Sequence, residues 1–154
     1  MSVVAKWMNW EEISPYKDQL IQMEHTLIKK YHYPERDIPF EYSINSVETL
    51  ETHLENGNTF FWAMVDDNEL IGYYWAYITN FLGKNRWVLR SLMIKESYSG
   101  KGVGTTAINE GLKKAKELGC YDSSTEYVPF NEAAKKSYEN AGYNISRVEV
   151  TKVL

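Results

Sequence analysis

The stretch that decides the fold is the glycine-rich run Ser99-Gly100-Lys101-Gly102-Val103-Gly104-Thr105. It separates a stretch of branched and aromatic residues, Arg86 to Ile94, from a stretch with apolar residues at helical spacing, Thr105 to Leu118. Closely spaced glycines let a ligand approach the backbone, and the helix that follows offers unpaired amides and the positive end of its dipole. The run therefore predicts either a pyrophosphate-binding loop or a tight turn between strand and helix.

The glycine-rich run matches neither of two common phosphate-binding motifs, the P-loop and the Rossmann fingerprint. A P-loop has Lys followed by Ser or Thr next to its last glycine, whereas Gly104 is followed by Thr105 and Thr106. A Rossmann fingerprint lies near the start of a βαβ unit, whereas this run comes after a predicted hairpin and meander. If the run binds a phosphate group, it therefore does so as neither of these two motifs.

Upstream of the glycine run, the apolar spacing predicts two helices. The first starts at Ser14 and Pro15, which are a capping residue and a typical first helical residue, and it ends near Tyr31. The second runs from Val47 to Glu55 with Ser46 as its cap. Both helices carry one apolar stripe, so each is expected to cover a sheet.

The remaining elements alternate between strands and helices. A hairpin and a third strand are predicted at Thr59–Val65, Leu70–Thr79 and Arg86–Ile94. After the glycine run, a helix, a strand, a helix and a last strand or strand pair are predicted at Thr105–Leu118, Cys120–Tyr127, Asn131–Ala141 and Tyr143–Val153. This order predicts a mixed α/β fold with a central, mostly antiparallel mixed sheet flanked by helices.

Length and composition indicate a single domain over residues 1–154. The chain has 154 residues, of which 44% are hydrophobic and 25% charged, and no repeat or linker divides it. No apolar run approaches the ~20 residues that cross a bilayer, so no membrane partner is expected. Cys120 is a single cysteine, which excludes an internal disulfide and fits a reducing, cytoplasmic location.

Charge narrows the classes of partner. The 17 lysines and arginines and 21 aspartates and glutamates give a formal net charge of -4. This balance disfavours nucleic acid as a partner and is compatible with a cationic substrate such as an amine. Because His25, His32 and His53 lack the spacing of a metal site, we assign no metal.

Two separated motifs resemble the GNAT superfamily of N-acetyltransferases. The acetyl-CoA loop of that family has Arg or Gln, two residues, Gly, one residue, then Gly or Ala; Gly102 and Gly104 match, and Ser99 stands where Arg or Gln is usual. A second signature of the family is matched at its spacing by Asn131, Ala134, Tyr138, Gly142 and Tyr143. The resemblance covers roughly Trp87 to Tyr143.

This resemblance implies acetyl-CoA as cosubstrate and a set of binding residues. Backbone groups of Leu92, Met93 and Ile94 are expected to hold the pantetheine arm. The remaining cofactor contacts are expected from Ser99, Gly100, Lys101, Gly102, Val103, Gly104, Thr105 and Asn131. Because Ser99 replaces Arg or Gln, cofactor binding is expected to be weakened rather than lost.

The resemblance also implies direct attack of a neutral primary amine on the thioester through a tetrahedral intermediate. Tyr138 is the expected acid that protonates the leaving sulfur, and the alternative is that it only packs in the core. Glu126 is the expected base, and the alternative is a solvated carboxylate at a strand end.

The acceptor is expected to be a small amine. Aromatic side chains of the second hairpin strand and of the preceding loop are candidates to wall its pocket, and the alternative is that most of them pack in the core: Tyr73, Tyr74, Trp75, Tyr77, Tyr31, Tyr33 and Phe40. The alternatives are acetylation of a protein N-terminus or lysine, and a non-catalytic acyl-CoA-binding regulatory module. Dimers are common among proteins that resemble this family, so a homodimer in which a second copy completes the last strand pair is also expected.

Overall fold

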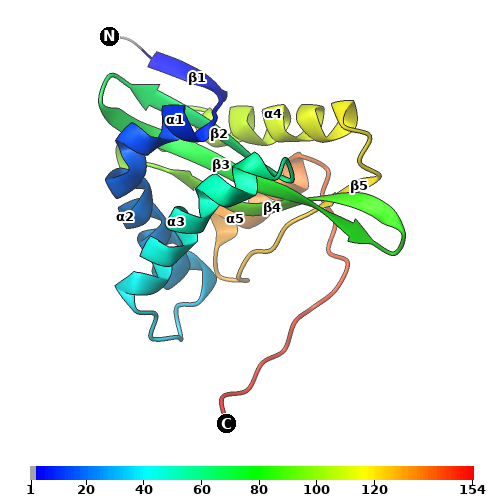
Figure 1. Ribbon diagram of the computed structural model, residues 1–154. Helices are drawn as coiled ribbons and strands as arrows, with labels where there is room; N and C mark the ends of the chain where they lie inside the picture. Colours follow the sequence, from blue (N-terminus) through cyan, green and yellow to red (C-terminus); the bar gives the residue numbers. More distant parts are fainter. Residues whose placement is uncertain (1–2) are drawn as a thin grey trace.

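A computed structural model describes residues 3–154 and shows a five-stranded sheet with helices on both faces (Figure 1). The strands lie in chain order, and they are antiparallel except for the last pair, β4 and β5, which is parallel. Their bounds are β1 (Val3–Trp7), β2 (Thr59–Asp66), β3 (Glu69–Phe81), β4 (Lys84–Ile94) and β5 (Asp122–Ser124). The predicted mixed α/β class with a central mixed sheet is confirmed.

The helices form a layer on each face of this sheet. Their bounds are α1 (Trp10–Ile13), α2 (Lys17–Leu27), α3 (Phe40–Glu55), α4 (Val103–Glu117) and α5 (Glu132–Asn140), with single turns η1 (Ser14–Tyr16), η2 (Ile28–His32, a π-helical turn) and η3 (Glu96–Tyr98). Helices α2 and α3 pack on one face through Leu20, Val47 and Leu50. Helices α4 and α5 pack on the other face through Ile108, Ala107 and Tyr138. Each face therefore has its own hydrophobic cluster.

The first two predicted helices are displaced from their expected starts. The chain becomes helical already at Trp10, because Asn9 and Glu12 form a reciprocal capping box that the prediction missed. Ser14 lies at the beginning of the 3-10 turn η1, before α2. Helix α3 begins after Pro39, and Ser46 is inside it with its hydroxyl donating to the Tyr42 carbonyl, so Ser46 is not the cap.

The strands at the two ends of the sheet differ from those that the sequence predicts. Strand β1 was not predicted, although its whole length, Val3–Trp7, pairs with Trp62–Asp66 of β2. Strand β5 covers only three of the residues predicted as Cys120–Tyr127. Residues 144–154, which include most of the predicted strand Tyr143–Val153, form no helix or strand and extend away from the body (Figure 1). Strand propensity alone forms no strand where no neighbouring strand offers hydrogen bonds.

Strand β4 contains a bulge at Arg90. Leu89 pairs with Ala76 of β3 and Ser91 pairs with Trp75, so Arg90 is the extra residue. Before the bulge, Trp87 and Leu89 face the α4 cluster, whereas afterwards Leu92 and Ile94 face it. The bulge therefore exchanges the two faces of the strand and bends it.

Candidate active site

The glycine run lies where the sheet opens between β4 and β5. These strands pair only between Arg86–Val88 and Asp122–Ser124, and they part where the bulge bends β4. The Thr125 hydroxyl still donates to the Leu89 carbonyl, at 3.3 Å. Beyond that contact, within the part of the chain that the structure describes, no strand pairs with β4 on this side. An open backbone edge therefore extends along β4 towards the glycine run.

The loop itself has the backbone shape that glycine permits. Gly100 and Gly102 have φ of +74 and +83, in the left-handed region, and a side chain at either position would meet no other atom within 4 Å. Gly102 is the N-cap of α4 and provides no side-chain cap, so the first amides of the helix have no side-chain partner there. Such amides at a positive dipole end form a site for an anionic group.

The other predicted loop residues have different surroundings. Ser99, Lys101 and Thr105 are exposed, and the Lys101 ammonium lies 5.3 Å from the centre of the Tyr98 ring. The Val103 side chain is buried in the α4 cluster, so only its backbone amide remains for a ligand. Gly104 lies against Ile94, with 3.8 Å between the position of a Cβ and the Ile94 side chain.

The strand segment predicted to hold the pantetheine arm borders this loop. Leu92, Met93 and Ile94 pair with β3 on one side, opposite Tyr74, Tyr73 and Gly72. Their other edge is the open edge described above. The role of these three residues in binding the cofactor stays a prediction.

Tyr138 lies at the point where the two strands part. Its side chain is 8% exposed, and its ring packs between those of Tyr127 and Tyr143, with centroids 6.1 and 5.7 Å away. Burial raises the pKa of the Tyr138 phenol above its ordinary value, and its interaction with the Thr125 hydroxyl acts in the opposite direction. The phenol is therefore protonated at neutral pH and close to the Thr125–Leu89 contact.

Glu126 and Asn131 come from the segment that joins β5 to α5. Glu126 is exposed. Burial raises the pKa of the Tyr33 phenol above its ordinary value, and the negative charges of Glu126 and Glu149 raise it further. Asn131 is the N-cap of α5 and its side chain accepts from the amide of Ala134 at 3.2 Å. The cap uses the oxygen of Asn131 and leaves its amide nitrogen for a ligand.

Comparison with known proteins now decides the family. The profile of the Acetyltransferase (GNAT) family matches residues 20–143. The chain belongs to the GNAT acetyltransferase family. It is 26% identical over 114 residues to the uncharacterized N-acetyltransferase YdgE of Bacillus subtilis, an alignment that covers 71% of this chain and 73% of that protein. We conclude that it is an acetyl-CoA-dependent acetyltransferase.

Solved structures share this GNAT fold at low identity. An aminoglycoside acetyltransferase from an uncultured soil metagenomic sample, in complex with sisomicin, is 14% identical with a TM-score of 0.74, covering 99% of this chain and 96% of that one. AAC(6')-Iy in complex with the bisubstrate analogue CoA-S-monomethyl-acetylneamine is 16% identical with a TM-score of 0.72, covering 100% of this chain and 99% of that one. At such identity these likenesses show the fold.

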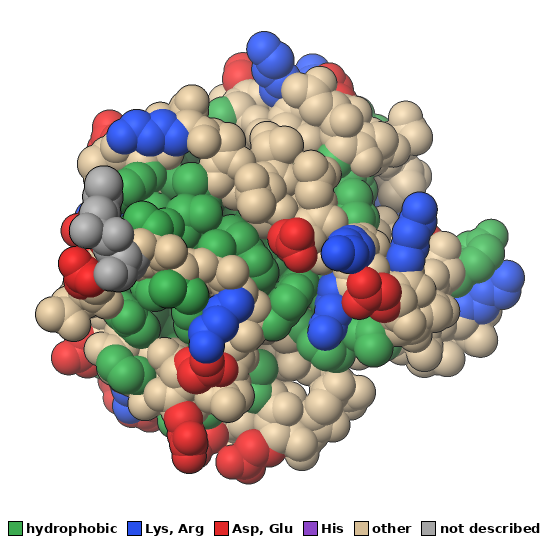
Figure 2. Space-filling model, turned by 90° about the horizontal axis from the view of Figure 1, so that it is seen from above, with side chains coloured by type: hydrophobic (Ala, Val, Ile, Leu, Met, Phe, Trp, Pro, Cys, Tyr) green, Lys and Arg blue, Asp and Glu red, His purple; other side chains and the backbone are tan. Residues whose placement is uncertain are grey.

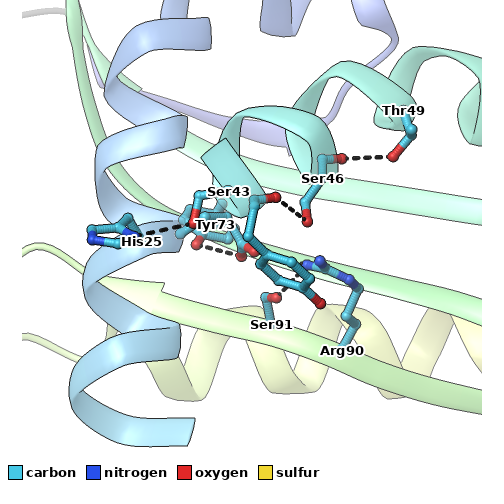
Figure 3. A network of polar contacts seen from close by, with 9 residues as sticks. His25, Ser43, Ser46, Thr49, Tyr73, Arg90 and Ser91 are labelled. Carbon is cyan, nitrogen blue, oxygen red and sulfur yellow. Dashed lines mark hydrogen bonds and ion pairs between the residues drawn. The ribbon is translucent and has the colours of Figure 1, made fainter. Parts of the chain in front are cut away.

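A buried polar cluster on the opposite face of β4 from α4 was not predicted. We call it the Glu24–Arg90 cluster, and it comprises Glu24, Tyr73, Arg90 and Ser91. The Tyr73 hydroxyl donates to Glu24 Oε1 at 2.8 Å, and Arg90 Nη1 donates to Glu24 Oε2 at 2.9 Å and to the Ser91 hydroxyl at 2.8 Å. Figure 3 shows Tyr73, Arg90 and Ser91 gathered beneath α3.

Each charge of the cluster is compensated. Glu24 is fully buried and accepts hydrogen bonds on both oxygens, while the Arg90 guanidinium stacks at 3.8 Å from the Trp75 ring centre. Tyr73 and Trp75, which were candidates for the wall of an acceptor pocket, are buried core residues. The sequence contained one signal, since Glu24 follows Leu20 by four residues and so falls on the apolar stripe of α2.

An apolar hollow elsewhere on the surface is separate from these residues. Figure 2 shows apolar side chains gathered on the face seen from above. A hollow of about 490 Å³ opens at the β1 edge of the sheet, and its lining includes Trp7, Trp10, Leu54 and Phe60. Because β1 and β5 are the two opposite edges of the sheet, this hollow is not part of the candidate active site.

Residues 3–154 contain neither a cluster of metal-ligating side chains nor a membrane-spanning helix. Over residues 3–154, no group of three or more His, Cys, Asp or Glu side chains is placed to hold a metal ion. Within the same range, no helix has the length and apolar character needed to cross a bilayer.

Proposed function

We propose that the protein transfers the acetyl group of acetyl-CoA to a primary amine of a small, cationic acceptor. The observation that carries this proposal is the open edge of β4, which begins beside Tyr138 and ends at the glycine loop. The net charge of -4 and the fold shared with aminoglycoside acetyltransferases support a cationic acceptor.

The residues around this edge fit acetyl-CoA. The pyrophosphate would bind the free amides at the start of α4, where the open space at Gly100 and Gly102 leaves room for it. Lys101 would supply the positive charge that Ser99 lacks. Backbone groups of Leu92 to Ile94 would hold the pantetheine arm as an added strand would be held. Acetyl-CoA supplies an electrophilic thioester carbonyl and a thiolate leaving group.

Two protein groups would move the protons. Glu126, directly or through water, takes a proton from the ammonium group of the acceptor, which leaves a neutral amine. The amine nitrogen then forms the new C–N bond, and the C–S bond breaks. Tyr138 donates its phenolic proton to the leaving sulfur, and the proton that the nitrogen releases restores Tyr138 through solvent.

The test is a thiol-release assay with a panel of small amines, aminoglycosides and lysine-containing peptides. We expect small amines to release CoA, and we expect Tyr138→Phe to lower kcat by at least about 100-fold, because general acid catalysis contributes about 10²–10⁴. Tyr127→Phe is the matched control, since its ring packs against Tyr138.

Three results would change the proposal. Equal kcat for Tyr138→Phe and the parent removes Tyr138 as the acid. Turnover with peptides but with no small amine makes the acceptor a protein N-terminus or lysine. CoA binding without turnover of any acceptor makes the chain a regulatory acyl-CoA-binding module.

A further inference from the structure

The buried carboxylate of Glu24 takes no part in the proposed reaction, and its burial is costly. The side chain is fully buried, with Arg90 Nη1 2.9 Å from one oxygen and the Tyr73 hydroxyl 2.8 Å from the other. A buried ion pair commonly contributes no more stability than apolar side chains of the same size, and its best-attested role is to specify one register over others. The Glu24–Arg90 cluster is therefore expected to exclude an alternative structure of β4.

The cluster needs Arg90 and Ser91 on the same face of β4. Neighbouring residues of a regular strand point to opposite faces, whereas a bulge places two residues of one strand opposite one residue of the other. Here Arg90 and Ser91 lie opposite Trp75, and Arg90 Nη1 donates to the Ser91 hydroxyl at 2.8 Å. Figure 3 shows both side chains beneath α3. The cluster therefore forms only with the bulge at residues 90 and 91.

Moving the bulge by one residue along β4 would turn one residue of the cluster to the other face. With the bulge at Leu89 and Arg90, opposite Ala76, the Arg90 guanidinium would face the apolar cluster beneath α4. With the bulge at Ser91 and Leu92, opposite Tyr74, the Ser91 hydroxyl would face that same cluster. Each change places a polar group among apolar side chains and breaks a hydrogen bond of the Glu24–Arg90 cluster, so both positions are disfavoured.

The position of the bulge decides where the candidate active site opens. Strands β4 and β5 stop pairing one residue before Leu89, whose carbonyl accepts from the Thr125 hydroxyl at 3.3 Å. A bulge one residue earlier would displace that carbonyl and the contact that it makes beside Tyr138. Leu92 to Ile94 and the glycine loop lie beyond the bulge, so they would keep their faces and their pairing with β3.

We propose that the Glu24–Arg90 cluster holds the β4 bulge at residues 90 and 91 and thereby positions the reacting end of acetyl-CoA against Tyr138. Glu24 and Arg90 are positioning residues in this role, because they act through the backbone of β4. The effect on the reaction rests on the proposed function, whereas the place of the bulge is measurable without any turnover. A displacement of about 1 Å at a reacting group can lower a rate about 100-fold, so a shifted bulge should lower kcat.

The experiment compares two variants in which stability and activity should change in opposite directions. An apolar variant combines Glu24→Met, Tyr73→Phe and Arg90→Met, and it should recover most of the stability that Arg90→Met alone loses. Its side chain at position 90 fits either face of β4, so the bulge is no longer held in place. Arg90→Lys keeps a cation, which only the side of Glu24 accommodates, so it should keep the bulge and lose stability.

Three measurements on the full chain give the result. Cross-strand nuclear Overhauser contacts locate the bulge, calorimetry gives the acetyl-CoA dissociation constant, and the thiol-release assay gives kcat with a small amine that the parent acetylates. In the apolar variant, the contacts of residue 90 should move from Trp75 to Ala76. Its kcat should fall at least about tenfold, while its dissociation constant should stay within about threefold of the parent.

Two further variants complete the comparison. Arg90→Lys should show the cross-strand contacts of the parent and a kcat within about threefold, despite a lower melting temperature. Glu69→Leu with Lys95→Met is the matched control, because it replaces an exposed ion pair between β3 and the end of β4, and it should behave as the parent does. If the apolar variant does not fold, Glu24→Gln with Arg90→Met keeps a partner for the Tyr73 hydroxyl and tests the same expectation.

Three outcomes would overturn the inference. They are an apolar variant whose residue 90 still contacts Trp75 alone, a shifted bulge with the kcat of the parent, and an equal loss of kcat in Arg90→Lys and the apolar variant. A parent that acetylates no amine would contradict the proposed function alone, and the contacts of residue 90 would still decide whether the cluster holds the bulge.

Discussion

The Glu24–Arg90 cluster and the glycine loop are both attached to β4, and they use side chains in opposite ways. In the cluster, a fully buried carboxylate is compensated by a guanidinium and a phenol at hydrogen-bond distance. In the loop, Gly100 and Gly102 have no side chains and open space around them. A change in the cluster should therefore reduce stability, whereas a change in the loop should reduce ligand binding and leave most of the stability.

The largest loss of stability is expected from Arg90→Met. It leaves the buried Glu24 carboxylate without its cation, which costs about 3–5 kcal/mol for a buried pair, and the partial exposure of Arg90 favours the lower end. Lys95→Met is the control, since its pair with Glu69 is exposed and should contribute less than about 1 kcal/mol. Urea unfolding measures both. Equal losses would mean that the cluster is no more important than a surface ion pair.

The contact between α4 and the sheet should give the next largest loss. A Cβ at Gly111 would overlap the Tyr74 ring, whose hydroxyl accepts from the Trp87 indole at 2.7 Å, so Gly111→Ala should cost about 1–3 kcal/mol. Gly104→Ala is the matched control, because a Cβ there makes an ordinary contact of 3.8 Å with Ile94. If both variants unfold at the same urea concentration, α4 has more freedom than the structure shows.

Gly102→Glu should separate binding from stability. Its left-handed φ costs about 1–2 kcal/mol for any other residue, and the carboxylate would repel pyrophosphate, so acetyl-CoA binding should fall at least about 100-fold in calorimetry. Gly83→Glu has the same backbone strain, with φ of +85 in the turn between β3 and β4. Loss of binding in both variants would show that strain, rather than the loop, is responsible.

The smallest effect is expected from His32, which lies near Glu24 and Arg90. Burial lowers the pKa of His32, Arg90 lowers it further, and Glu24 opposes both. Because the pKa of His32 is lower in the folded chain, the unfolded chain binds the proton more readily. The stability that neutral His32 contributes is therefore fully present above the pKa of the unfolded chain and is lost as the pH falls through the pKa of the folded chain. His32→Gln should therefore lose less stability than the parent between pH 7 and pH 5, in melting curves. The exposed His53→Gln should behave as the parent does.

The two regions also differ in how far the sequence predicts them. Gly102 and Gly104 are recognisable because a loop that binds through its backbone needs glycine at fixed spacing along the chain. The Glu24–Arg90 pair joins residues 66 positions apart, and it depends on a bulge that no local pattern marks. Thr125 is another such case, since its contact with Leu89 exists only because β5 leaves the sheet there.

The ends of the sheet were predicted least well for a related reason. Strand β1 is short and exposed, so its residues lack the apolar alternation of a core strand and only pairing with β2 defines it. Residues 144–154 have that alternation and no partner. In both cases the sheet, rather than the local sequence, decides whether a strand forms.

The bulge at Arg90 has a consequence for how the chain tolerates changes in length. Deleting Arg90 would restore regular pairing with β3 and leave Leu92 and Ile94 facing α4, because Leu89 and Ser91 already pair with adjacent residues of β3, but it would remove the cation beside the buried Glu24 carboxylate. A single-residue deletion in the β3–β4 turn has no such effect on β4, because the turn lies outside the paired strands. Homologous proteins of different length should therefore gain and lose residues in the β3–β4 turn and keep the extra residue of the β4 bulge.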